Sequence, residues 1–110
     1  GAGLRPSLTG IHAYTAAKHA LVGLTKQLSL ELAHHGITVN SIAPGFIRSN
    51  PATERQWAAY GKKGQAQLVQ RIHTRRLGSP KDVAAAAAFF TSQEAGWITA
   101  QVLSVDGGVT

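Results

Sequence analysis

Two short apolar segments place the strongest limit on what this chain can form. Residues 37–43 (ITVNSIA) and 101–105 (QVLSV) are rich in β-branched and other apolar side chains. A short strand without strict alternation is typical of a parallel sheet that is covered on both faces. Two such strands alone would leave both faces and both edges of a sheet exposed. We therefore expect an α/β, doubly wound parallel sheet of which this chain forms one half, completed by an N-terminal part or a partner chain.

Helices are predicted on either side of these strands. Apolar residues recur every three or four positions over Tyr14–His35, and Gly36 follows where a left-handed cap is expected. A last helix is predicted from Pro80 to about Ser92, with Ser79 as its N-cap. The apolar stripe of the first helix, which would serve a core or a contact between subunits, consists of Ala17, Leu21, Leu24, Leu28 and Leu32.

Between the strands lies a polar, irregular insert. Short helices are expected at 54–60 and 65–72, separated by Gly61 and Gly64. The order of elements is therefore helix, strand, helical insert, helix, strand, which is typical of a wound α/β sheet.

Composition excludes several classes of protein. The chain has 110 residues and no cysteine, which excludes a disulfide scaffold and thiolate chemistry. It has no apolar run long enough to cross a membrane and does not begin with a signal peptide, so we expect a cytoplasmic protein. It begins with glycine rather than methionine, and we expect it to be processed or truncated.

The net charge of +6 would suit a protein that binds nucleic acid. No binding motif and no set of stacking aromatics accompanies the basic residues, so we expect no nucleic-acid partner. The cations at 62–63 and 71–76 are interpreted as a solvated rim or as a contact with a cofactor phosphate. The five histidines follow no common ligand spacing, and we expect no metal site.

Tyr14 and Lys18 stand four positions apart and share one helical face. A tyrosine hydroxyl has an ordinary pKa near 10, which a nearby ammonium group lowers by favouring the phenolate. Tyr14 would then serve as a general acid or base towards a hydroxyl or carbonyl. A tyrosine and a lysine four positions apart also occur together by chance, so the surrounding motifs decide whether this pair is interpreted as catalytic.

That context is a series of motifs in a fixed order. They are Tyr14-Thr-Ala-Ala-Lys18, Gly36-Ile-Thr-Val-Asn40, Pro44-Gly-Phe-Ile47, Arg76-Leu-Gly-Ser-Pro80 and 102–108. Together they resemble the C-terminal half of the short-chain dehydrogenase/reductase superfamily. The resemblance implies that residues 1–110 are the C-terminal part of a single Rossmann-type domain, beginning just after the family's catalytic serine.

The resemblance also implies roles for individual residues. Tyr14 corresponds to the acid/base, and Lys18 to the residue that holds the nicotinamide ribose and lowers the tyrosine pKa. Pro44, Gly45 and Phe46 correspond to the loop that packs against the nicotinamide. The backbone of Ile47 would meet the carboxamide, and Ser49 replaces the threonine that usually contacts the cofactor.

Residues 50–74 correspond to the substrate lid, a name kept below for this segment. Trp57, Tyr60 and Leu68 are its expected apolar contacts with substrate. Ordinary packing of a small helix explains these three side chains equally well.

The implied reaction moves a hydride between NAD or NADP and a secondary alcohol or ketone. The family's glycine-rich loop and catalytic serine have no counterpart in the sequence, so we expect the 110 residues alone to be inactive. The alternative is a non-catalytic, truncated half that acts as an association module. In the family the 14–35 helix packs against its copy, which implies a homodimer or tetramer.

Overall fold

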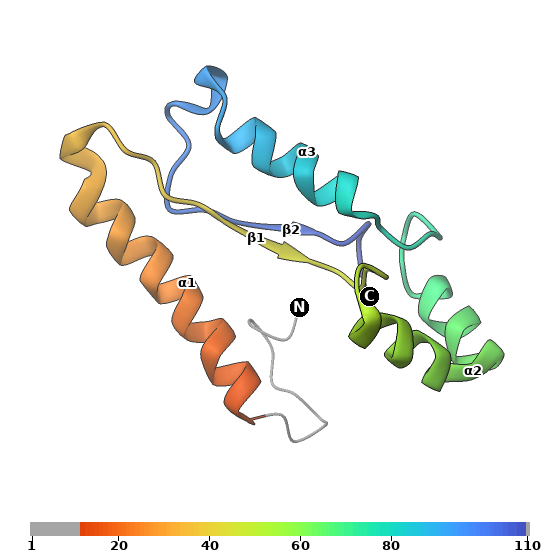
Figure 1. Cartoon of the computed structure of the whole chain (residues 1–110). Helices are drawn as coiled ribbons and strands as arrows, with labels where there is room; N and C mark the ends of the chain where they lie inside the picture. The colour runs from red at the N-terminus through yellow and green to blue at the C-terminus, as the bar shows by residue number, and fades with distance from the viewer. Residues whose placement is uncertain (1–11, 110) are drawn as a thin grey trace.

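The computed structural model describes the backbone of residues 12–109 and the side chains of residues 15–109. Its elements follow the predicted order (Figure 1). They are α1 (His12–Leu32), η1 (Ala33–His35), β1 (Ser41–Pro44), α2 (Pro51–Gln70), α3 (Pro80–Phe90), η2 (Gln93–Ala95) and β2 (Val102–Val105). The expected left-handed cap is present, since Gly36 has φ 73°.

β1 and β2 form a two-stranded parallel sheet, which confirms the expected strand direction. The register pairs Ser41 with Val102 and Pro44 with Val105. α1 lies along one side of the strand pair and α3 along the other, while α2 lies beyond the end at which both strands finish (Figure 1). This arrangement is a partial Rossmann-type fold.

β1 begins later than the predicted 37–43 segment, and before Ser41 side-chain bonds are mixed with a backbone bond from the Ala100 N–H to the Val39 carbonyl (2.8 Å). The Asn40 amide donates to the Ile98 carbonyl (3.0 Å) and accepts from the Gln101 N–H (3.1 Å). The Val39 N–H donates to the Thr99 hydroxyl (3.0 Å). Residues before Ser41 therefore bond to the loop that precedes β2.

Hydroxyl groups attach α1 to the rest of the chain. Thr25 and Ser29 are buried on the inner face of the helix, and their hydroxyls bond those of Ser41 (2.5 Å) and Thr99 (2.7 Å). Thr25 bonds Ser41 at the start of β1, whereas Ser29, one turn later in α1, bonds Thr99, which lies before the start of β2. α1 therefore runs antiparallel to the strands.

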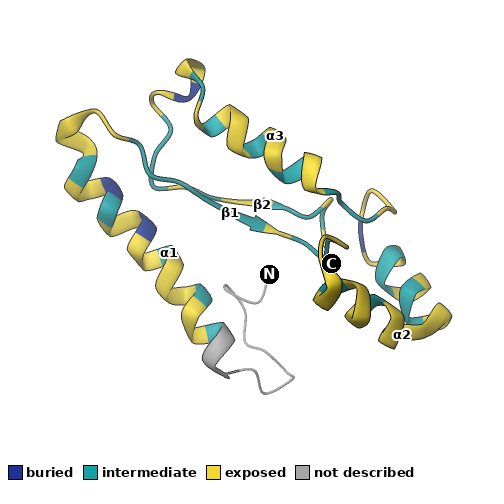
Figure 2. Cartoon of the chain, viewed as in Figure 1, coloured by how far each residue is buried: buried dark blue, intermediate teal, exposed yellow. Residues whose placement is uncertain are grey.

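The apolar stripe of α1 does not form a core within the described residues. Leu21 is 43% exposed and Leu24 is 53% exposed, although both were candidates for the interior. Figure 2 shows the outer surface of α1 as mostly exposed, with its buried residues confined to one face. These two leucines are therefore not part of a core formed by the described residues alone, and the choice between a core and a contact between subunits stays a prediction.

Little apolar surface is buried anywhere in the described part of the chain. Ile72 and Ala95 are its buried apolar residues, whereas Trp97 is fully exposed and Phe89 and Leu103 are 49% and 43% exposed. This exposure fits the expectation that further protein covers the sheet and helices. Within residues 12–109, no helix combines the length and apolar character needed to span a bilayer.

Helix α2 contains one of the two predicted breaks. Gly61 has φ 68° and ψ 173°, which interrupts the helix, whereas Gly64 continues within its second part. Asn50 and Thr53 cap the start, since the Asn50 side chain accepts from the Thr53 N–H (2.9 Å). The Gln65 amide donates to the Trp57 carbonyl (2.9 Å) across the break. The insert is therefore two helical parts joined at Gly61.

The break predicts how Gly61→Ala changes stability. This combination of dihedral angles is essentially restricted to glycine, so the substitution should lower the free energy of unfolding by about 1–3 kcal/mol. Urea unfolding of the intact protein measures the change. Ala59→Gly, in the first part of α2, gives the ordinary cost of a helical glycine, about 0.5–1 kcal/mol. A gain in stability for Gly61→Ala would mean that the helix is continuous.

Candidate active site at the carboxyl ends of the strands

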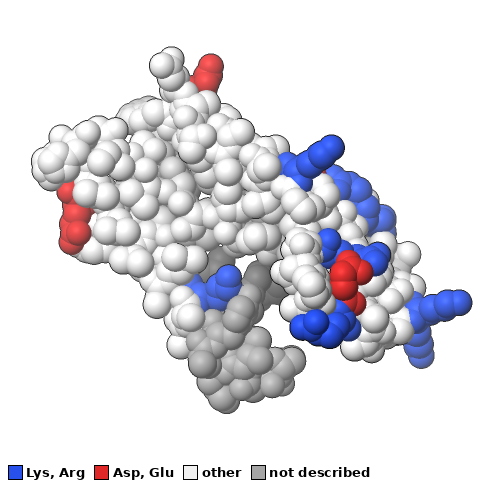
Figure 3. All heavy atoms as spheres, in the orientation of Figure 1, with Lys and Arg blue, Asp and Glu red and all other residues white. Residues whose placement is uncertain are grey.

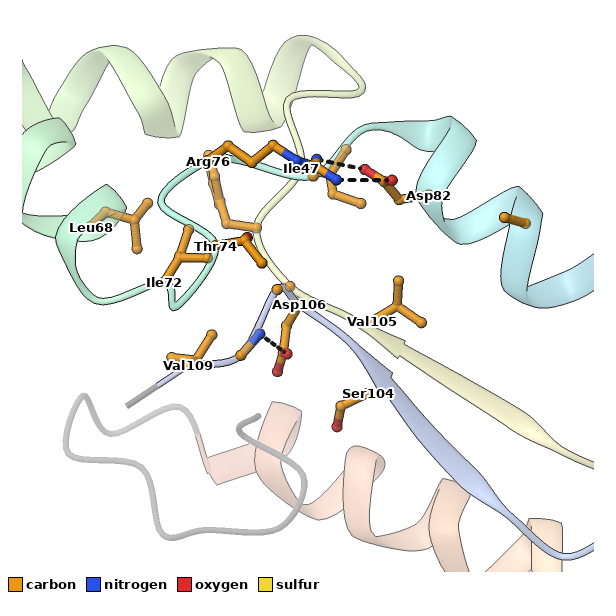
Figure 4. A pocket seen from close by; sticks show the side chains of 16 residues that line it. Ile47, Leu68, Ile72, Thr74, Arg76, Asp82, Ser104, Val105, Asp106 and Val109 are labelled. Atoms are coloured by element: carbon orange, nitrogen blue, oxygen red, sulfur yellow. Dashed lines mark hydrogen bonds and ion pairs between the residues drawn. The ribbon is translucent and has the colours of Figure 1, made fainter.

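A cavity of about 320 Å³ opens at the carboxyl ends of β1 and β2 (Figure 4). In open α/β sheets, ligands bind outside the carboxyl ends of the strands. Segments that follow both strands line the cavity, together with the end of α2 and the start of α3. The lining residues used below are Gly45, Phe46, Ile47, Leu68, Ile72, Arg76, Gly78, Asp82 and Asp106.

Gly45 brings the predicted cofactor loop to this cavity. Its N–H donates to the Val105 carbonyl (3.0 Å) and so continues the ladder past the end of β1. A Cβ at this position would lie 2.8 Å from the Cβ of Asp106, closer than two carbon atoms can approach. Beyond it, Ile47 pairs with Gly78 in an isolated parallel bridge. The loop is therefore fixed between the end of β2 and the start of α3.

Phe46 packs against the first part of the lid. Its ring centroid lies 6.0 Å from that of Trp57 and 5.8 Å from that of Tyr60. The two lid rings meet each other edge-on, with centroids 6.5 Å apart. Leu68 lies in the second part of α2 and lines the cavity instead. The cluster gives Trp57 and Tyr60 a packing role, and contact of either ring with substrate stays a prediction.

An ion pair that the sequence did not predict supports this cluster. The Arg48 guanidinium binds the Glu54 carboxylate through two bonds of 2.9 and 2.8 Å and lies 5.4 Å from the centre of the Trp57 ring. The hydrogen bond from Arg48 lowers the pKa of Glu54. Both side chains are about half exposed, so the contribution to stability is small.

A second ion pair joins the loop that follows the lid to α3 at the edge of the cavity (Figure 4). Arg76 donates to Asp82 (3.1 Å), and the same carboxylate accepts from the Ser79 N–H (2.8 Å). The hydrogen bond from Arg76 has the largest effect, and together these bonds lower the pKa of Asp82 to about 2. The sequence signal was an acidic residue three positions after the predicted N-cap, a spacing that helix starts favour.

The predicted catalytic pair lies at the same end of the sheet as the cavity. Lys18 is seven residues before Thr25, about 10 Å along a helix. Pro44 is three residues beyond Ser41, about 10 Å along a strand. Because Thr25 bonds Ser41 and the two elements run antiparallel, half-buried Lys18 lies level with Pro44. Tyr14 belongs to the first turn of α1, and its side chain lies outside the described residues.

Ser49 precedes the capped start of α2. It is exposed, and its N–H donates to the Thr53 hydroxyl (3.0 Å). It does not line the cavity. Over residues 15–109, no three His, Cys, Asp or Glu side chains are grouped in a way that would hold a metal ion.

Positive charge gathers over α2 and the start of α3 (Figure 3). Two acidic residues, Glu54 and Asp82, lie in this stretch, and each is bound to an arginine. Segments that carry an excess of positive charge therefore contribute to the lining of the cavity. The cations of this stretch are Arg48, Arg55, Lys62, Lys63, Arg71, Arg75, Arg76 and Lys81.

Comparison with known proteins gives consistent matches. The family described as "Enoyl-(Acyl carrier protein) reductase" matches residues 3–110. The 3-oxoacyl-(acyl-carrier-protein) reductase of Rickettsia felis is 44% identical over 96 residues, which cover 87% of this chain and 38% of that protein. Dehydrogenase/reductase SDR family member 4 of Oryctolagus cuniculus is 39% identical over 100 residues, covering 91% of this chain and 37% of that protein. The chain thus spans little more than a third of these relatives.

A solved structure matches the whole chain. It is YwfH, described as an NADPH-dependent reductase involved in bacilysin biosynthesis. The two chains are 34% identical with a TM-score of 0.88, and the match covers 100% of this chain and 44% of YwfH.

The Asp82 carboxylate predicts a defined pH dependence. Because its pKa is lowered to about 2, Asp82 stabilises the fold above the unfolded-state pKa, and this contribution is lost as the pH falls through about 2. Asp82→Asn should therefore lower the unfolding midpoint by a constant amount from pH 5 to 8. Below about pH 4 the difference from the unsubstituted protein should shrink. Thermal unfolding measures this difference in midpoint, and Glu94→Gln on η2 is the control for loss of a negative charge. A difference that grows on acidification would contradict the assignment.

Proposed function

This chain belongs to the short-chain dehydrogenase/reductase superfamily, and on that premise we propose that it forms the nicotinamide- and substrate-binding half of an NAD(P)-dependent oxidoreductase. The reaction is hydride transfer between the cofactor and a secondary alcohol or ketone. One observation carries the proposal: the start of α1, to which Tyr14 and Lys18 belong, lies at the same end of the sheet as the Gly45–Ile47 loop, because Thr25 and Ser29 fix α1 along the strands (Figure 1). The proposal concerns the intact protein, because the chain spans 38% of its Rickettsia relative.

The residues at this end of the sheet fit the nicotinamide half of the cofactor. Phe46 and Ile47 are half-buried and offer an apolar surface to a flat ring, and both line the cavity. Lys18 offers an ammonium group that suits ribose hydroxyls, and the exposed Ser49 hydroxyl is a further donor. When bound, the dinucleotide supplies or takes up the hydride. The choice between NAD and NADP is made at the adenosine ribose, for which the sequence holds no matching segment.

Tyr14 moves the proton in this proposal. In reduction its hydroxyl donates to the oxygen of the substrate carbonyl, and in oxidation its phenolate accepts from the alcohol. Lys18, one helical turn later, favours the phenolate through its positive charge. The lid residues Trp57, Tyr60 and Leu68 close the apolar side of the substrate site.

The charge on the lid narrows the class of substrate. The lid carries four Lys and Arg residues against one Glu, and its second part lines the cavity through Leu68 and Ile72. An alcohol or carbonyl compound with a polar or acidic group therefore suits the site better than a purely apolar one. The Rickettsia relative is named for a 3-oxoacyl group on a carrier protein. A carbonyl compound of that kind belongs to the proposed class.

The exposed stripe of α1 supports a second element of the proposal, self-association. Leu21 and Leu24 lie on adjacent turns of α1, and both are about half exposed in this chain. We propose that this face joins two copies of the intact protein as a homodimer or within a tetramer. The alternative function, a non-catalytic association module, would use the same surface but would bind no dinucleotide.

Tyr14→Phe in the intact protein tests the catalytic role. Loss of the hydroxyl removes the proton donor, so kcat should fall by about 10²–10⁴-fold while the Kd for the dinucleotide stays within about twofold. Steady-state kinetics and cofactor titration measure the two quantities. His19→Ala, an exposed residue on the same helix, is the control. Retained turnover in Tyr14→Phe would overturn the assignment, and absence of dinucleotide binding to the unsubstituted protein would favour the association module.

Leu21→Lys/Leu24→Lys tests self-association. Two charges on the apolar face should disfavour burial against a second copy, so the mass in sedimentation should fall by half or more. Leu30→Lys is the matched control, because Leu30 is 74% exposed and lies on a different face of α1. Equal masses for the double variant and the control would place the interface elsewhere.

A further inference from the structure

The segment from Asp106 to Val109 contacts the end of the lid through its backbone. The His73 N–H donates to the Gly108 carbonyl (2.7 Å), and the Thr74 N–H donates to the Gly107 carbonyl (3.1 Å). Ile72 and Val109 form an isolated antiparallel bridge next to these bonds. The end of the lid is thus held by main-chain bonds to residues that follow β2.

Two glycines make this close contact possible. Gly107 and Gly108 have φ of 69° and 81°, a conformation that other residues rarely adopt. A Cβ at Gly107 would lie 2.5 Å from the Thr74 hydroxyl oxygen, and one at Gly108 would lie 2.5 Å from Nδ1 of His73. A side chain at either position would therefore push the two segments apart.

Asp106 connects this contact to the cofactor loop. Its carboxylate accepts from the Gly108 N–H (2.9 Å) and so fixes the turn. On its other side, its Cβ and Cα lie against Gly45, where an added Cβ would come within 2.8 and 3.0 Å. Ile72 is 4% exposed and lies at the same junction. One residue therefore contacts both the loop proposed for the nicotinamide and the turn that holds the lid (Figure 4).

We propose that the 106–109 segment is a positioning element for substrate, and this inference rests on the function proposed above. It fixes residues 72–74 of the lid relative to the Gly45–Ile47 loop. The lid then bends at Gly61, while its far end keeps a constant place beside the cavity. Weakening the bonds to residues 72–74 should therefore impair substrate binding more than binding of the dinucleotide.

Gly108→Ala in the intact protein is the primary test, with Gly36→Ala as its matched control. Both glycines have a positive φ (81° and 73°), but Gly36 has open space where its Cβ would stand. Hydrogen exchange at residues 72–74 should become at least about fivefold faster in Gly108→Ala and remain unchanged in Gly36→Ala. His73→Ala in the Gly108→Ala background removes the clashing ring and should restore part of the protection.

Kinetics give the second readout. In Gly108→Ala the KM for the carbonyl substrate should rise about three- to tenfold, while the Kd for the dinucleotide stays within about twofold. Equal loss of substrate and cofactor binding would indicate a general defect and would overturn the proposal. Unchanged exchange at 72–74 would overturn it as well.

Asp106→Ala and Asp106→Asn keep the test decisive if Gly108→Ala fails to fold. Asp106→Ala removes the bond to Gly108 but keeps the Cβ beside Gly45, whereas asparagine retains an oxygen that accepts the same bond. Faster exchange at 72–74 in Asp106→Ala with near-normal exchange in Asp106→Asn supports the proposal, and equal exchange in both contradicts it.

Hydrogen exchange does not depend on turnover. An intact protein that lacks reductase activity would therefore overturn the proposed function while the exchange data still decide whether the 106–109 segment holds the lid.

Discussion

The parallel pairing of β1 with β2 determines where everything else lies. Parallel strands finish at the same edge, so the segments after Pro44 and Val105 meet there although 60 residues separate them in the sequence. The close approach of Gly45 to Asp106 is the direct result. The chain between the strands must return to the starting edge, and α3 makes that return. The lid and the start of α3 consequently surround the cavity.

Polar contacts fix α1 against this pair. Apolar surfaces slide over one another at little cost, whereas a hydroxyl–hydroxyl bond requires a defined distance and direction. The bonds from Thr25 and Ser29 therefore set the position of α1 along the strands. That position places Lys18 level with the cofactor loop and leaves Leu21 and Leu24 about half exposed. Site geometry and the exposed helical face thus have one cause.

Local signals in the sequence predicted the elements well. Gly36, Ser79 and Gly61 each mark an end or a break that the structure contains, because capping and positive φ depend on a few neighbouring residues. The loop at Gly45–Ile47 was also placed correctly beside the strand end. The partner of the apolar stripe of α1 could not be predicted from neighbouring residues in the sequence. Periodicity identifies an apolar face, but it does not tell whether that face meets its own sheet or another chain.

Contacts between distant residues were not predictable in the same way. Nothing in the spacing of Phe46 and Trp57 shows that their rings stack, since this depends on how the loop enters α2. The link between Gly108 and His73 joins residues 35 positions apart and requires the complete arrangement of β2 and α2. The signal available in the sequence was the pair of adjacent glycines, which indicates a tight turn without indicating its partner.

The two ends of the lid are held by different kinds of interaction, and this difference bears on how substrate choice varies. The start depends on particular side chains, namely the rings of Phe46 and Trp57 and the pair of Arg48 with Glu54. The far end depends on main-chain bonds at residues 72–74, which most side chains would permit. Residues 61–71 lie between these anchors and are largely exposed. Changes at the exposed positions among them would therefore alter the surface beside the site without loss of either anchor, which gives a physical reason for substrate choice to vary through the middle of the lid.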